Sequence, residues 1–218
     1  MSRILEKVTA FVTRSTPAGD DLLLFEHPHA GIQIPAGTVE AGEAPEDAVQ
    51  REATEETGLD GLALRSGLGT DDWRLPEHLR YVAERTTVYS RPDPASFDWA
   101  FLPRGTLVHV ERVVPGFSQV TFQEWDHWPE RSYLSMRITG WVRDDALATV
   151  RRRHFFNLVH PGDTPVRWTV AIDNHVFTLF WAPLDCLPRP ISPQDMWLSF
   201  LRRVYPSLAL ETEAREER

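Results

Sequence analysis

Three glutamates in one short segment have the spacing of a cation site. Glu52, Glu55 and Glu56 are three and four residues apart, so on a helix their carboxylates project from one face. Like charges so placed repel by roughly 0.2–0.5 kcal/mol per pair when solvated, and a hard divalent cation turns this repulsion into attraction. Because the donors are all oxygens, the set favours Mg²⁺, with Mn²⁺ possible, over zinc. The alternative is a solvated acidic helix face, which is the commoner reading of an isolated Glu-x-x-Glu-Glu.

The residues around these glutamates predict the helix that would carry them. Pro45 suits the first turn, where its missing N–H is not needed, and Glu46 and Asp47 favour the positive end of the helix dipole. Gly58 stands where a helix commonly ends in a left-handed residue. We therefore expect a helix over 44–57 with its three carboxylates near the C-terminal end.

A longer pattern surrounds this helix. Gly37 is followed after five residues by Glu43, then after seven more by Arg51-Glu52 and the run Ala53-Thr54-Glu55-Glu56-Thr57-Gly58-Leu59. The spacing resembles the signature of the Nudix hydrolase family, and it matches that signature without a departure. With so many identities at fixed distances, the pattern weighs strongly against the solvated acidic face.

The resemblance implies roles for individual residues. It implies that the Gly37 carbonyl joins the three glutamates around the metal, and that Glu43 and Arg51 hold the loop, helix and loop in shape, with Gly58 as the helix end. The residues expected to take part in catalysis are Glu52, Glu55, Glu56 and Arg51. We predict Glu55 as the general base, although members of the family vary and a residue outside the signature can serve.

Three further residues are candidates for contacts with the substrate or the metal. Phe25 and Gln33 lie shortly before the signature, where they could approach a base or a ribose. The family often adds an acidic ligand from a region downstream of the signature, and Asp173 is the candidate here. No motif fixes any of these three positions.

The segments on both sides of the signature read as a mixed α/β domain. Short apolar or alternating runs predict strands, and the segment from Ser192 carries a capping residue followed by apolar residues at helical spacing. This order is similar to the α/β/α sandwich with a mixed sheet of the Nudix fold. The expected strands are 7–14, 22–25, 32–34, 62–68, 150–159 and 174–181.

The strands that should follow the signature are delayed by a long stretch, and a structureless loop of that length is rare. Residues 85–148 read instead as an inserted small all-β barrel of short strands between Pro and Gly turns. The run Leu102-Pro-Arg-Gly-Thr-Leu and the later Gly140-Trp-Val resemble the bacterial Src-homology-3-like domain. The predicted organisation is a discontinuous Nudix domain, residues 1–84 and 149–218, interrupted by this barrel, which could serve as a lid, a homodimer contact or a peptide or protein contact.

Composition limits the partners. The chain has 218 residues and a net charge of −9, which argues against binding duplex nucleic acid but allows a small nucleotide substrate beside a bound cation. A lone cysteine, Cys186, excludes an intrachain disulfide and fits a reducing compartment. With neither a signal-peptide pattern nor an apolar run near 18 residues, we expect no membrane contact and a cytoplasmic location.

The sequence thus predicts a Mg²⁺-dependent hydrolase that cleaves the pyrophosphate linkage of a nucleoside diphosphate joined to another moiety. The alternative is a catalytically silent Nudix-fold protein that senses a nucleotide and recruits a partner through the barrel. Loss of the signature carboxylates would mark such a conversion, and all of them are present.

Overall fold

The computed structural model describes residues 3–28, 30–126, 131–172 and 175–211. The chain divides into two compact units, one made of Met1–Glu6 with Asp71–Arg153 and the other of Lys7–Thr70 with His154–Arg218. The predicted boundaries at 85 and 148 both lie inside the first of these units. In the described part of the chain, no helix has the length and apolar character needed to cross a membrane.

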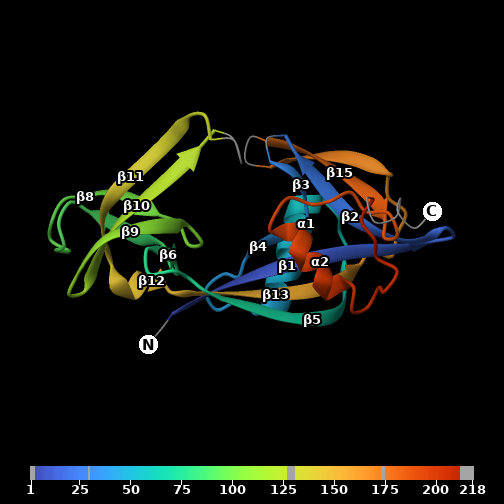
Figure 1. Ribbon diagram of the computed structural model, residues 1–218, viewed down its shortest axis with the longest axis horizontal. Helices are drawn as coiled ribbons and strands as arrows, with labels where there is room; N and C mark the ends of the chain where they lie inside the picture. Colours follow the sequence, from blue (N-terminus) through green and yellow to red (C-terminus); the bar gives the residue numbers. More distant parts are fainter. Residues whose placement is uncertain (1–2, 29, 127–130, 173–174, 212–218) are drawn as a thin grey trace. The chain divides into compact units, whose positions relative to one another are not determined.

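The second unit is built on an eight-stranded sheet in which the spatial order of the strands differs from their order in the sequence (Figure 1). Its main path runs β14 (Arg167–Ile172), β15 (His175–Pro183), β2 (Gly19–His27), β1 (Ile4–Thr16), β13 (Val150–Val159) and β5 (Ala63–Arg74). Two short strands lie off this path: β3 (Gly31–Gln33) pairs with β2, and β4 (Ala36–Thr38) pairs with β1.

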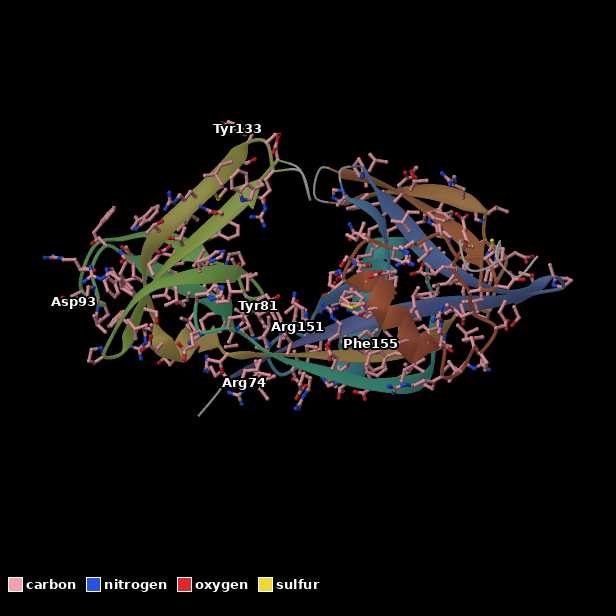
Figure 2. All side chains as sticks on the ribbon, viewed as in Figure 1. Arg74, Tyr81, Asp93, Tyr133, Arg151 and Phe155 are labelled. Carbon is pink, nitrogen blue, oxygen red and sulfur yellow. The ribbon has the colours of Figure 1, made fainter. Side chains whose placement is uncertain are left out.

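Two helices cover opposite faces of this sheet. Val8, Ala10 and Val12 of β1 pack in one cluster with residues of α1 (Pro45–Thr57). Phe11, between them in sequence, packs in another cluster with residues of α2 (Gln194–Leu201). Because successive side chains of a strand point to opposite faces, α1 and α2 must lie on the two sides of the sheet. On the α2 side, Phe155 of β13, labelled in Figure 2, stacks on Phe200 with ring centroids 3.9 Å apart.

The start of α2 differs from the prediction. Ser192 was expected to cap this helix, but the residue before the first turn is Pro193, and no side chain caps the end. The helix begins at Gln194, and Ser192 lies outside the helical turn. The Gln194 N–H instead donates to the Ile191 carbonyl at 2.7 Å.

The other unit is a seven-stranded sheet with its own core. Its strands pair in the order β12 (Leu147–Ala148), β6 (Leu79–Val82), β9 (Leu107–Val114), β10 (Phe117–Trp125), β11 (Leu134–Arg143), β7 (Thr86–Tyr89) and β8 (Asp98–Leu102), with the 3₁₀ turn η1 (Asp144–Ala146) before β12. The main hydrophobic cluster of this unit consists mostly of valines, among them Val82, Val108, Val120 and Val142. The likeness of this unit to a Src-homology-3 barrel stays a prediction.

Candidate active site

Helix α1 has the boundaries that its end signals favour. Pro45 is its first residue, Glu46 and Asp47 occupy the first turn, and Gly58 ends it with φ of 68°. The Gly58 N–H donates to the Thr54 carbonyl at 2.8 Å, and the indole N–H of Trp168 donates to the Thr57 carbonyl at 2.9 Å. The end of the helix that carries the glutamates is thus fixed by both backbone and side-chain bonds.

Strand β4 faces the carboxylates of α1. The backbone N–H of Thr38 donates to Glu52 Oε1 at 3.0 Å, and that of Ala36 donates to Glu56 Oε2 at 2.8 Å. Gly37 lies between these two donors, and a Cβ at Gly37 would overlap the Glu52 carboxylate. Glycine is therefore required here because the backbone of β4 and a charged side chain of α1 approach each other closely.

The peptide groups of β4 alternate between two neighbours, and this corrects the expectation for Gly37. Val8 of β1 is opposite Gly37, and the Ala10 N–H donates to the Pro35 carbonyl at 2.8 Å. By the antiparallel pattern, the Gly37 carbonyl then points to β1, whereas those of Ala36 and Thr38 point to the α1 side. The Ala36 carbonyl, rather than that of Gly37, thus points to the side of β4 on which Glu56 lies.

Arg51 is the centre of the charged network. Its Nε and Nη2 donate to the two oxygens of Glu43 at 2.9 and 3.0 Å, and Nη2 also donates to the Thr38 carbonyl at 3.2 Å. Its Nη1 lies 3.0 Å from Glu52 and 3.3 Å from Glu55. One guanidinium thereby joins the loop before the helix, strand β4 and two of the predicted catalytic carboxylates.

The electrostatics of this network follow from its hydrogen bonds. The bidentate bond from Arg51 lowers the pKa of Glu43 below its ordinary value, and the same bond raises the pKa of Arg51. The Glu43 side chain is 16 % exposed, and its second oxygen also accepts from the Glu40 N–H at 2.8 Å. Both ends of this pair are therefore charged at neutral pH.

The three glutamates differ in exposure and partners. Glu52 is 16 % exposed, whereas Glu55 is 60 % exposed and lies 3.3 Å from Arg51. Within the described residues, no three carboxylate, imidazole or thiol side chains converge on one point as metal ligands would. Glu52 and Glu56 instead accept hydrogen bonds from backbone N–H groups of β4. These bonds stabilise the charged form of two carboxylates that would otherwise repel each other.

The remaining candidates are placed unequally. Phe25 is 6 % exposed and belongs to the core on the α1 side, so its expected contact with a substrate base is not supported. Gln33 is partly exposed and lies opposite Phe25 in the β2–β3 pairing, on the same face of the sheet. Asp173 lies outside the described residues.

The sequence alone did not indicate two groups of residues that shape this site. Ala36 and Thr38 act through backbone groups, and only the pairing of β4 with β1 reveals their direction. Gln194 is buried, and its Oε1 accepts from the Ile34 N–H at 2.6 Å across a sequence separation of 160 residues. No local pattern signals a contact over that distance.

Comparison with known families and structures gives one clear match. The model of the NUDIX domain family matches residues 5–116, just over half of the chain. No curated protein matches the chain. An Ap4A hydrolase structure from C. elegans is similar at 14 % identity and a TM-score of 0.41, covering 95 % of this chain and 100 % of its own. A protein described as a NUDIX hydrolase from Listeria monocytogenes gives 14 % and 0.41, covering 93 % and 96 %. At such TM-scores, neither structure bears on the function of this chain.

Proposed function

This chain belongs to the Nudix family, and from that premise we propose that it is a Mg²⁺-dependent enzyme that cleaves the pyrophosphate linkage of a nucleoside diphosphate joined to another moiety. Nudix hydrolases are pyrophosphohydrolases, so the reaction class follows from the family. The metal, the nucleotide substrate and the role of each residue are the parts that we propose.

The observation that carries the proposal is the arrangement of Glu52 and Glu56 against β4. Both carboxylates turn to the same three-residue strand, where they accept from the N–H groups on either side of Gly37. The guanidinium of Arg51 is shared among Glu43, Glu52 and Glu55. The site therefore has more negative than positive charge, as a cation site requires.

The donor set fits a hard divalent cation. Glu52, Glu55 and Glu56 supply carboxylate oxygens from one helix face, and the Ala36 carbonyl faces the same side. We assign these four residues to the metal, and Gly37 is needed because only glycine lets Glu52 approach β4. Oxygen ligands favour Mg²⁺ or Mn²⁺. When bound, the cation would neutralise the diphosphate and lower the pKa of a coordinated water.

The protein's own groups would then carry the proton and hold the geometry. The Glu55 side chain is 60 % exposed, so a water molecule can reach its carboxylate. In the proposed step, Glu55 takes a proton from the attacking water, the water oxygen bonds to phosphorus, and the bond from phosphorus to the bridging oxygen breaks. Arg51 and Glu43 position the helix and β4 rather than touch the reacting atoms.

We propose, as the sequence suggested, that residues 85–148 contribute a lid, a homodimer contact or a peptide or protein contact. Deleting 85–148 with a short linker and assaying a nucleotide panel tests the lid role. Unchanged turnover of every substrate would remove it.

The direct test compares helix variants that differ only in position. Glu55→Gln and Glu56→Gln should each lower kcat by about 10²–10⁴-fold on nucleotide-sugar, dinucleotide and triphosphate substrates with Mg²⁺, with products identified by mass. Glu46→Gln, an exposed first-turn residue of the same helix, is the matched control and should keep wild-type turnover. Wild-type rates in both site variants would disprove the assignment. Tight nucleotide binding without turnover by the wild type would favour a sensor.

A further inference from the structure

We propose that Gln194 fixes the orientation of the Gln33 side-chain amide, so that Gln33 presents its NH₂ group as a hydrogen-bond donor to the nucleoside part of the substrate. The chain would then select nucleosides that carry an acceptor at that point. The inference rests on the proposed function in one respect, namely that a nucleotide lies along β3 with its diphosphate at the glutamates of α1.

The start of α2 is bonded to the outer edge of β3. The Ile191 N–H donates to the Ile32 carbonyl at 2.9 Å, and Gln194 Oε1 accepts from the Ile34 N–H at 2.6 Å. Gln194 is 9 % exposed, so its amide has little access to water. A buried amide held in this way keeps one orientation, because turning it over would leave a buried backbone N–H facing another donor.

The orientation of the Gln194 amide also sets the orientation of the Gln33 amide. A backbone N–H can only donate, so the end of the Gln194 amide that faces Ile34 must be its oxygen. Its Nε2 then faces Gln33 Oε1, at 3.5 Å. A hydrogen bond of that length is weak. If the Gln33 amide were turned over, however, two NH₂ groups would face each other and repel, so the orientation with Oε1 toward Gln194 is favoured. Gln33 therefore turns its oxygen to Gln194 and its NH₂ away from it.

Gln33 is in the right place to contact a nucleoside. It precedes Ala36 by three residues, which is about 10 Å along an extended chain, and the Ala36 N–H holds Glu56. Beside it on the same sheet face, Phe177 contacts Phe25 edge-on at 5.3 Å and His27 at 5.1 Å between ring centroids. Phe177 is only partly buried. A planar base can stack on the Phe177 ring while a polar group at its edge or on the sugar meets Gln33.

Two substitutions should replace the donor that residue 33 presents to the substrate with an acceptor, one by changing Gln194 and one by changing Gln33 itself. In Gln194→Glu, one carboxylate oxygen still accepts from Ile34 and the other can only accept from Gln33, whose amide must then turn its oxygen outward. Gln33→Glu places an acceptor there directly. Gln194→Met keeps the size of the side chain and removes both polar ends, which frees the Gln33 amide to adopt either orientation.

The measurement is a ratio of kcat/KM values for matched substrates with Mg²⁺. The pairs are a 6-oxo against a 6-amino purine and a 4-oxo against a 4-amino pyrimidine. Each pair exchanges an acceptor for a donor at the exocyclic group and a donor for an acceptor at the ring nitrogen beside it. For at least one pair, the wild type should prefer the member with the acceptor. Gln194→Glu and Gln33→Glu should both shift that ratio toward the donor by about tenfold, mainly through KM, and Gln194→Met should bring it close to one.

The ratio separates positioning from a merely structural role. Loss of packing at Gln194 would slow both members of a pair alike and leave the ratio unchanged, and this outcome in a folded Gln194→Glu protein would overturn the proposal. If Gln194→Glu does not fold, an unchanged ratio in Gln33→Glu overturns it equally. If the wild type turns over no nucleotide, the proposed function fails, and calorimetry of the same pairs as methylene-bridged analogues still tests the orientation by the ratio of their Kd values.

Discussion

The unit of residues 1–6 and 71–153 holds 13 basic and 13 acidic residues, whereas the unit of 7–70 and 154–218 holds 10 basic and 19 acidic. The first unit carries exposed ion pairs, such as Arg152 with Asp72 at 2.7 Å and Arg143 with Asp145 at 2.6 Å. In the second, Arg51 alone serves Glu43, Glu52 and Glu55. The whole charge of −9 thus belongs to the unit that carries the signature.

This difference shows what an excess of carboxylates means in each setting. Exposed ion pairs contribute little to stability and keep a surface soluble. In a cluster where several carboxylates share one guanidinium, part of the negative charge is not neutralised. Hydrogen bonds from backbone N–H groups then help to hold the carboxylates in place. The two units should therefore respond differently to loss of an arginine, to Mg²⁺, to an added methyl group and to acid.

Loss of an arginine should give the largest difference in stability between the two units. Arg51→Met removes five contacts and leaves Glu43 and Glu52 largely buried without their cation, so the free energy of unfolding should fall by about 3 kcal/mol. Arg152→Met, in an exposed pair of the other unit, should cost below about 1 kcal/mol. Urea denaturation at pH 7 measures both. Equal losses would show that Arg51 is an ordinary surface residue.

The cation should stabilise one unit only. At a Mg²⁺ concentration of about 100 Kd, binding to the folded state contributes about 2.7 kcal/mol. Hydrogen exchange should slow in peptides of α1 and β4 and stay unchanged in those of β9 and β10, and a chelator should reverse the effect. Glu52→Gln combined with Glu56→Gln is expected to abolish the protection. Protection spread equally over both units would place the bound cation elsewhere.

How far the sequence predicts the molecule depends on how local the cause is. Helix α1 was expected over 44–57 and spans Pro45–Thr57, because its proline, acidic first turn and glycine act within a few residues. Strand β13 has the expected bounds, 150–159, because it is a clear run between turn residues. Their signals need no partner strand to be read.

The unpredicted parts depend on distant partners. Strands β4, β6, β8 and β14 are short or lack clear alternation, and each is defined by the strand that it pairs with. The direction of the Gly37 carbonyl likewise follows from its pairing with Val8, and the orientation of Gln194 follows from Ile34. The sequence therefore predicts the chemistry of the site better than the backbone and the amide groups that complete it.

Two glycines test the close approach of β4 and α1. Gly37→Ala places a methyl group on the Glu52 carboxylate, so stability should fall by about 2 kcal/mol and kcat by at least about tenfold. Gly116→Ala is the control in the other unit: its φ of 83° strains an alanine by about 1 kcal/mol, but no atom lies within 4 Å of the added Cβ. Its turnover should equal that of the wild type. Normal turnover in Gly37→Ala would refute the tight contact.

Lowering the pH should give the smallest difference in stability between the two units. Arg51 lowers the pKa of Glu43 below its ordinary value of 4.5, and Arg143 lowers the pKa of Asp145 below 3.8. A carboxyl with a lowered folded pKa stabilises the protein fully above its unfolded pKa, and this contribution disappears as the pH falls through the folded value. The stability lost in Glu43→Gln should therefore be about 1 kcal/mol at pH 7 and shrink steadily below pH 4.5.

The matched variant in the other unit distinguishes a shared network from a simple surface pair. Arg143 and Asp145 are 55 % and 58 % exposed, so water and salt screen them, whereas Arg51 and Glu43 are 26 % and 16 % exposed. Asp145→Asn should accordingly have a smaller effect than Glu43→Gln at every pH, and 0.5 M salt should remove more of it. Denaturation curves from pH 3 to 7 at two salt concentrations measure this. If both variants lost their effect equally in salt, the Glu43 pair would be no better shielded than the exposed one, and Arg51 could not hold the helix and β4 through it.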